Sequence, residues 1–340
     1  MEITSLGLLT IKAESTYGTD AVPTLAANLI PPIGDSVSWN VQSTPVDRKL
    51  MDGTLDNLVG FNTMPNVNLK FRYELRGNRT DGTTADISSG NSAHAIEIDS
   101  LLQAANLNPT YTAESTTGSR NGYVVYQPKV YSGVGPSVTC YWYTALKLHK
   151  LVGGKVNVEK ITWEAGKIVT LDISITGKYV APIDNNFPTS GTTFLATKPP
   201  LFDTASVSIG SYNGAVLSQL TVDLGNKVKL RKSAIDADSI AGFVISGMDP
   251  KGTLDPESVA EATNPFWADW RNSNVKTITV TTGGTTAATS GNQFTGTFVS
   301  EYKGLPYGAR DDVRILQVAF NIVKADLTGA AGSQFQLKFS

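Results

Sequence analysis

The chain has 340 residues, of which 41% are hydrophobic, so it can build either two domains of ordinary size or one large domain with a proper core. A formal net charge of −2 and a pI of about 5.8 exclude the strongly basic surface that tight binding to nucleic acid or to an acidic membrane requires. Cys140 is the single cysteine, which excludes an intramolecular disulfide. We find neither a signal peptide at the start nor an apolar stretch long enough to span a bilayer, and expect synthesis in a cytoplasm.

Alternation of apolar and polar residues predicts β-strands in the first half of the chain. Apolar side chains occupy every second position over 67–75 and again over 169–175, which is the period of a half-buried strand. A further strand at 155–163 precedes the second of these, and the turn at 164–167 joins the two as a hairpin.

One short amphipathic helix is predicted between these strands. Apolar residues recur at helical spacing from Ala95 to Ala105, Ser92 can cap the start, and Asn106 and Pro109 end the helix. We expect this helix to pack against a sheet.

The second half repeats this order of elements. Strands are expected at 205–209, 216–224, 243–245, 277–281, 294–300, 316–322 and 335–339. A helix is expected to start at Asp255-Pro256-Glu257 and to be interrupted by Pro265. Asn264 can cap a second short helical piece through Phe266, Trp267 and Trp270. The segment 181–204, rich in Pro, Asn, Thr and Ser, predicts a linker between a domain at 1–180 and a domain at 205–340. We therefore predict a mainly β protein with two tandem domains of similar topology, each with one short α-helix.

The residues that carry chemistry predict no catalytic, metal or cofactor site. His94 and His149 lie in no nucleophile or zinc motif. Asp236 and Asp238 begin like a calcium loop, but Ile240 occupies the next ligand position. No glycine-rich segment leads into a helix as a phosphate loop does. We expect no enzyme and no cofactor.

Two long loops, 42–66 and 225–240, are predicted to be contact surfaces. Apolar residues mixed with both charge signs would promote aggregation unless they are buried against another copy or folded over the chain's own sheet. The basic residues of the second loop either hold phosphates or protect an edge strand. The candidate contact residues are Asp47, Arg48, Lys49, Leu50, Met51, Asp52, Asp56, Lys229, Arg231 and Lys232.

The segment Ile11–Pro23, IKAESTYGTDAVP, resembles the N-terminal signature of the tail tube proteins of long-tailed bacteriophages. In that family a strand, a long hairpin loop with acidic and basic residues, and a second strand ending near a glycine follow, and they are matched here by 36–41, 42–66 and 67–77. The resemblance extends as a pattern over nearly the whole chain, although only 17–23 is motif-like.

The resemblance implies a structural virion protein whose sandwich-like β domains join into a ring-shaped β-barrel. Rings would stack into the tail tube, the long loops would bridge rings, and genomic DNA would pass through the lumen during ejection. Members with one tube domain form six-fold rings, so two domains imply a homotrimer with pseudo-six-fold symmetry, and a homohexamer is the alternative.

The implied location is the virion tail, assembled in the host cytoplasm. Other tail proteins such as the tape measure, terminator and distal tail proteins are the implied partners, with transient, non-specific passage of DNA and no membrane contact. Because a lumen must not hold DNA, a neutral to acidic strand face is the candidate lumen surface, formed by Thr170, Asp172, Ser174 and Thr176.

Two other functions compete with this interpretation. Five tryptophans and a surface rich in Thr and Gly would suit a carbohydrate-binding or carbohydrate-active β-sandwich, for which we expect a monomer with glycan affinity. A bacterial surface or fimbrial subunit is expected to carry a secretion signal, which residues 1–10 do not resemble.

Overall fold

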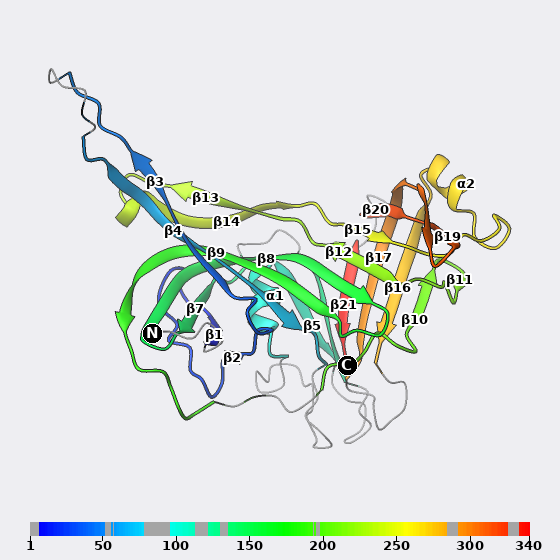
Figure 1. The fold of residues 1–340 in the computed structure, drawn as a ribbon, viewed down its shortest axis with the longest axis horizontal. Coiled ribbons are helices and arrows are strands. Elements are labelled where there is room, and N and C mark those ends of the chain that lie inside the picture. Colours follow the sequence, from blue (N-terminus) through cyan, green and yellow to red (C-terminus); the bar gives the residue numbers. More distant parts are fainter. Residues whose placement is uncertain are drawn as a thin grey trace.

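The computed structural model describes residues 7–51, 56, 58–77, 96–112, 122–129, 135–192, 194, 198–283, 292–325 and 333–340. The protein is mainly β, and the helices of its described part are α1 (Asp99–Ala104), α2 (Phe266–Arg271) and a short 3₁₀ turn at Ala237–Ser239. The first half of the chain lies at one end of an elongated molecule and most of the second half at the other (Figure 1). Among the described helices, none is long and apolar enough to cross a membrane.

The first half forms an antiparallel sheet around two long strands, β8 (Lys147–Glu164) and β9 (Thr170–Asp184). Lys167 N–H donates to Glu164 O, which closes the turn and confirms the predicted hairpin. The strand order is β2-β1-β7-β8-β9-β4-β3. The remaining strands are β1 (Leu8–Ala13), β2 (Leu29–Ile30), β3 (Ser38–Val46), β4 (Phe61–Glu74), β7 (Val138–Tyr143) and a separate hairpin of β5 (Leu107–Thr112) with β6 (Tyr123–Pro128).

The second half pairs its strands in the order β11-β10-β16-β17-β20-β15-β12. Every neighbour pair in this order is antiparallel, as in the first half. When the seven strands of each half are ranked by their position in the chain, both halves have the same strand order, so that β8 corresponds to β17 and β3 to β12. The strands are β10 (Ser206–Ile209), β11 (Tyr212–Asn213), β12 (Gln219–Asp223), β15 (Lys251–Leu254), β16 (Val275–Thr282), β17 (Phe294–Gly304) and β20 (Val318–Ile322). Two hairpins, β13 (Asn226–Lys232) with β14 (Ile240–Met248) and β18 (Tyr307–Arg310) with β19 (Val313–Leu316), and β21 (Phe335–Phe339) complete the half.

The two halves share one sheet. β12 pairs with the end of β8 from Gln219↔Glu164 to Val222↔Ile161, and β21 pairs with β6. Trp163, which is fully buried on β8, stacks on Phe294 of β17 with ring centroids 5.7 Å apart. Over the residues that the structure describes, the resulting 17-stranded sheet does not close into a barrel.

The alternating residues at 67–75 are confirmed as core. Val67, Leu69, Phe71, Tyr73 and Leu75 are all at most 3% exposed, because one face of β4 packs against the interior while the other stays polar. The period of two therefore predicted both the strand and its buried face.

The predicted helical elements need correction. No helix begins at Asp255-Pro256-Glu257, because Pro256 O accepts from Leu316 N–H and Glu257 bridges to Ile315, which makes this segment extended. α2 forms where expected, but the Asn264 side chain does not cap it. α1 begins at Asp99, and the predicted cap Ser92 lies outside the described residues.

Candidate functional site

A hairpin arm projects from the first half of the molecule (Figure 1). The predicted loop 42–66 is shorter than expected, because β3 continues to Val46 and β4 begins at Phe61, with register from Ser38↔Lys70 to Val46↔Phe61. β4 pairs with β9 only from Asn66 onward, so in the described part of the chain the hairpin beyond this point pairs only with itself. We call the described residues of 42–66 the arm.

The arm exposes apolar side chains near its end. Val46 is 47% exposed and Phe61 62%. The structure places most of the predicted contact residues together beyond the end of β3, where Asp47, Arg48, Lys49, Leu50 and Met51 are all exposed; Asp56 is exposed as well, and Asp52 lies outside the described residues. This cluster mixes both charge signs with apolar groups on a two-stranded support.

The other predicted contact residues lie on a different hairpin, β13–β14. Lys229, Arg231 and Lys232 are exposed on β13, which occupies much of the predicted loop 225–240. This hairpin folds back over the first half (Figure 1). There Phe243 is 5% exposed, and the Asn226 amide donates to Ala105 O and Val156 O. The sequence predicted two similar loops, but one hairpin projects and the other is packed.

The motif-like N-terminal segment forms a tightly bonded loop around Glu14. The Glu14 carboxylate, 8% exposed, accepts hydrogen bonds from the N–H groups of Gly18 and Gly153, both at 2.7 Å, and from the hydroxyls of Ser137 and Thr139. Because a buried carboxylate is costly unless its oxygens are satisfied, these bonds hold the loop against β7 and β8.

Asp20 anchors the far end of the same loop. Its carboxylate accepts from Tyr141 Oη at 2.5 Å, from Lys150 Nζ at 3.3 Å and from Val22 N–H. Burial alone would raise the pKa of Asp20, but these hydrogen bonds outweigh it and lower the pKa below its ordinary value. The family resemblance lies in this segment, but its sequence does not predict these hydrogen bonds of Glu14 and Asp20.

The predicted lumen residues do share one face of β9. Thr170, Asp172 and Thr176 are half-buried and alternate with buried neighbours, whereas Ser174 on the same face is itself buried. Arg72 Nε donates to Asp172 at 2.7 Å, and its pKa is raised by this contact. β4 thus adds cations to this face, which carries both charge signs and is not neutral to acidic as predicted.

The same polar face continues across both halves of the molecule. Lys70 pairs with Glu159 at 2.8 Å, and the Thr221 and Thr253 hydroxyls are hydrogen-bonded at 2.8 Å. A shallow groove on this face is lined by residues from β8, β12, β15, β17 and β20, including Lys160, Asp223, Lys251 and Lys303. The face therefore spans the junction between β8 and β12, and ion pairs offset several of its charges.

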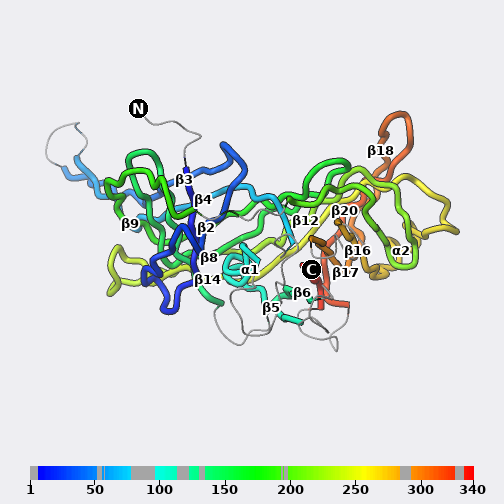
Figure 2. The backbone as a smooth tube through the Cα atoms, turned by 90° about the horizontal axis from the view of Figure 1, so that it is seen from below, coloured from blue at the N-terminus to red at the C-terminus, as the bar shows by residue number. Residues whose placement is uncertain are grey.

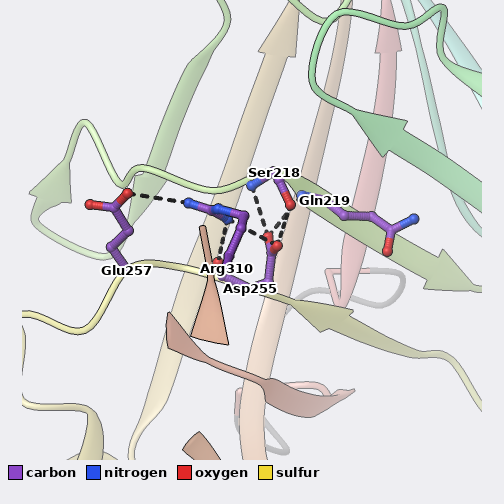
Figure 3. Close-up of polar contacts among 5 residues, drawn as sticks. All are labelled: Ser218, Gln219, Asp255, Glu257 and Arg310. Carbon is purple, nitrogen blue, oxygen red and sulfur yellow. Dashed lines mark hydrogen bonds and ion pairs between the residues drawn. The ribbon is translucent and has the colours of Figure 1, made fainter. Parts of the chain in front are cut away.

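An ionic cluster joins three strand ends in the second half (Figure 3). Asp255 accepts from the N–H groups of Ser218 and Gln219, at 2.9 and 2.7 Å, and from the Ser218 hydroxyl. Arg310 Nη1 donates to Asp255 at 3.0 Å, and Nη2 donates to Glu257 at 3.3 Å. The cluster thereby ties the start of β12 and the end of β15 to β18. Sequence reasoning missed it, because Asp255-Pro256-Glu257 matched a helix start.

The described histidine and the cysteine, His149 and Cys140, are packed within the fold. His149 packs beside Trp39 and Trp142, with ring centroids 5.5 and 5.2 Å away, and His94 lies outside the described residues. Burial raises the pKa of the Cys140 thiol well above its usual range, which disfavours the thiolate. The described residues contain no group of three or more His, Cys, Asp or Glu able to hold a metal ion.

Comparison with known protein families matches residues 4–322 to a family described as phage tail tube protein. No curated protein matches the chain.

Proposed function

Since the chain belongs to the phage tail tube protein family, a structural and non-enzymatic family of the virion tail, we propose that its copies join into rings that stack as the wall of the tube. Genomic DNA passes through the lumen of this tube during ejection. Assembly takes place in the host cytoplasm, and the tape measure, terminator and distal tail proteins are the further partners. The family match confirms the resemblance found in Ile11–Pro23 and favours this function over a carbohydrate-binding β-sandwich.

The arm is the structural feature that best supports self-assembly. Its apolar side chains, Phe61 among them, are exposed on a hairpin that pairs only with itself in the described part of the chain. Unpaired edges and exposed apolar groups favour association, and a closed ring buries both without leaving a growing aggregate. We assign contacts between rings or subunits to the arm cluster from Asp47 to Met51 with Asp56, and to Lys229, Arg231 and Lys232 of β13.

A trimeric ring is the assembly that two tandem domains favour. Support comes from the strand order, which is the same in 1–180 and 205–340, with 181–204 between them. Two equivalent units per chain reach pseudo-six-fold closure with three copies, whereas a single tube unit per chain needs six.

We assign the polar face of β9, with Thr170, Asp172, Ser174 and Thr176, to the lumen. This assignment is supported by the ion pairs Arg72–Asp172 and Lys70–Glu159, because a cation already paired with a carboxylate is less available to a phosphate. DNA then slides along the wall without being held.

The test is negative-stain electron microscopy of the purified protein at increasing concentration, with light scattering on the same samples. We expect hollow tubes or stacked annuli with three chains per ring. Six chains per ring would overturn the trimeric ring built from two tube domains per chain, and a stable monomer at every concentration would overturn the tube function.

A further inference from the structure

We propose that one copy joins the next by adding residues 34–38, just before the arm, to the free edge at residues 305–308, and that this contact repeats the junction between β12 and β8 within the chain. The inference rests on the proposed self-assembly and specifies its partner as a second copy of this chain. The register of the two halves, the open side of each segment and the positions of the two segments in the molecule support this contact.

The strand registers align the two halves residue by residue. In the first half Lys70 pairs with Ser174, and in the second half Lys251 pairs with Asn321. Both β8 and β17 carry a bulge against the next strand, at Glu159 and at Lys303 respectively. Matching the bulges places Lys251 at the position of Lys70, so the two halves superpose in register and not only in strand order.

This alignment identifies the counterparts of the internal junction. Ser38 pairs with Lys70 as Asp223 pairs with Lys251, so residues 34–38 correspond to β12. Counting from the bulges, residues 305–308 correspond to 161–164, the part of β8 that binds β12. Each chain therefore contains the complete junction once. It also contains an equivalent of each of the two junction strands that is not joined to the other, at residues 34–38 and 305–308.

On the side that forms the internal junction, neither residues 34–38 nor residues 305–308 have a partner strand in the described chain. Residues 34–37 form no strand, and Asp35 has a φ of 58°, whereas their counterpart β12 is extended and paired on both sides. β18 pairs with β19 alone among the described strands. A strand edge left open in this way is a template for pairing with another chain.

Among the residues that the structure describes, the side chains at the free edge, residues 305–308, lack the cover that β12 gives to their counterparts on β8. Trp163 of β8 is 0% exposed beside Leu220 of β12, with which it pairs, whereas its counterpart Tyr307 is 54% exposed. Two exposed tryptophans of α2 lie nearby: the Trp267 ring is 5.6 Å from Tyr307 and contacts that of Trp270. An aromatic cluster of this kind marks a surface that a partner covers.

The arm follows residues 34–38 as the β13–β14 hairpin follows β12. Within the chain, that hairpin packs across the neighbouring half and buries Phe243. The arm, with its exposed Phe61, accordingly lies across the second half of the next copy. Because the arm is longer than the β13–β14 hairpin, its outer end extends beyond that half.

The positions of the two edges allow the contact to repeat. The β3–β4 hairpin and β18 lie at opposite ends of the elongated molecule (Figure 2). A head-to-tail contact closes into a ring when its rotation divides a full turn. Because the contact copies the internal junction, every domain in the ring has the same neighbour relationship.

A disulfide test follows from the register. Gln219 lies opposite Glu164 in the internal junction, and the corresponding positions are Gly34 and Gly308. A Cβ at Gly34 meets nothing within 4 Å, and one at Gly308 meets side-chain atoms of Gln317 and Ile315. Since directly opposed strand residues are close enough for a disulfide, oxidation of assembled Gly34→Cys/Gly308→Cys should give linked species ending at three chains on a non-reducing gel.

Two controls define the contact. The pair Gly34→Cys/Ala309→Cys should link poorly, because Ala309 points to the opposite face of the strand. An equal mixture of the single variants Gly34→Cys and Gly308→Cys should give linked dimers and nothing larger. Equal linking of both double variants, or rings without linking by Gly34→Cys/Gly308→Cys, would overturn the inference and leave the ring function standing.

A further variant tests the contact in case the cysteine variants do not assemble. Tyr307→Asp places a charge in the proposed contact, so it should raise the concentration needed for assembly by about tenfold or more, with an unchanged melting temperature for the unassembled chain. Assembly of this variant at the unaltered concentration would contradict the contact. If the unaltered protein forms no rings or tubes at any concentration, both the tube function and this inference are wrong.

Discussion

The hydroxyl of Tyr17 accepts a 2.6 Å hydrogen bond from the backbone N–H of Phe243, a residue 226 positions further along the chain. The same hydroxyl donates to Gly153 O at 3.0 Å. The ring occupies a slot between two glycines, because a Cβ at Gly242 would come within 2.5 Å of it and one at Gly153 within 3.0 Å. One side chain thus joins the N-terminal loop, β8 and the β13–β14 hairpin.

Tyr17→Phe should lower the free energy of unfolding by about 1–3 kcal/mol, because the buried N–H of Phe243 loses its partner. Chemical denaturation monitored by circular dichroism measures this loss. Tyr212→Phe, at a half-buried tyrosine packed on the core at β11, is the control and should change stability little. Equal effects of the two variants would show that the Tyr17 hydroxyl does not hold the hairpin.

Lys155 should make stability rise with pH in mildly alkaline solution. Burial lowers its pKa from 10.5 to about 8, and its Nζ donates to Gly135 O and Pro136 O. Between these pKa values the unfolded chain binds more protons than the folded one, so the free energy of unfolding increases with pH. From about pH 7 to pH 9.5 the unaltered protein should gain roughly 2 kcal/mol relative to Lys155→Met. Parallel pH profiles would contradict the lowered pKa.

Phe61→Ser and Phe243→Ser should separate assembly from folding. Phe61 is 62% exposed on the arm, so its replacement should leave the melting temperature of the unassembled chain unchanged and reduce tube formation in electron micrographs. Phe243 is 5% exposed, so its replacement should cost about 3–5 kcal/mol of stability. Normal tubes from Phe61→Ser would argue against a contact at the arm.

Arg310→Met should weaken the cluster that fixes β18. Arg310 and Asp255 are 22% and 19% exposed, and their charge-assisted hydrogen bonds should be worth about 1–3 kcal/mol. Lys167→Met, which breaks the far more exposed pair with Glu164, is the comparison and should cost less than about 1 kcal/mol. Thermal unfolding of the two variants measures the difference, and a smaller loss for Arg310→Met would refute a structural role for the cluster.

Asp172→Lys should slow DNA ejection from virions that carry it. The substitution removes the partner of Arg72 and adds a second cation, so the polar face would attract phosphates. Asp184→Lys, at an exposed position at the end of β9, is the control of equal charge change. The rate of DNA release in vitro is the measurement, and an unchanged rate for Asp172→Lys would place β9 away from the lumen.

The sequence alone determined the class of structure, the main strands and the family. Alternation over 67–75 and 169–175 is a local property, since successive side chains of a strand point to opposite faces whatever the strand pairs with. The same holds for α2, whose apolar side chains sit at helical spacing. The segment Ile11–Pro23 carried the resemblance that the family match confirms.

Only the tertiary structure decided which strands meet. Both 42–66 and 225–240 were predicted as long loops, yet the first hairpin projects and the second packs, because β12 finds a second partner in β8 while residues 34–38 have no such second partner in the described chain. Asp255-Pro256-Glu257 has the local signal of a helix, but hydrogen bonds with residues about 60 positions away hold it extended. Strand partners, and the charges they bring to a shared face, depend on contacts distant in the chain, which no local pattern encodes.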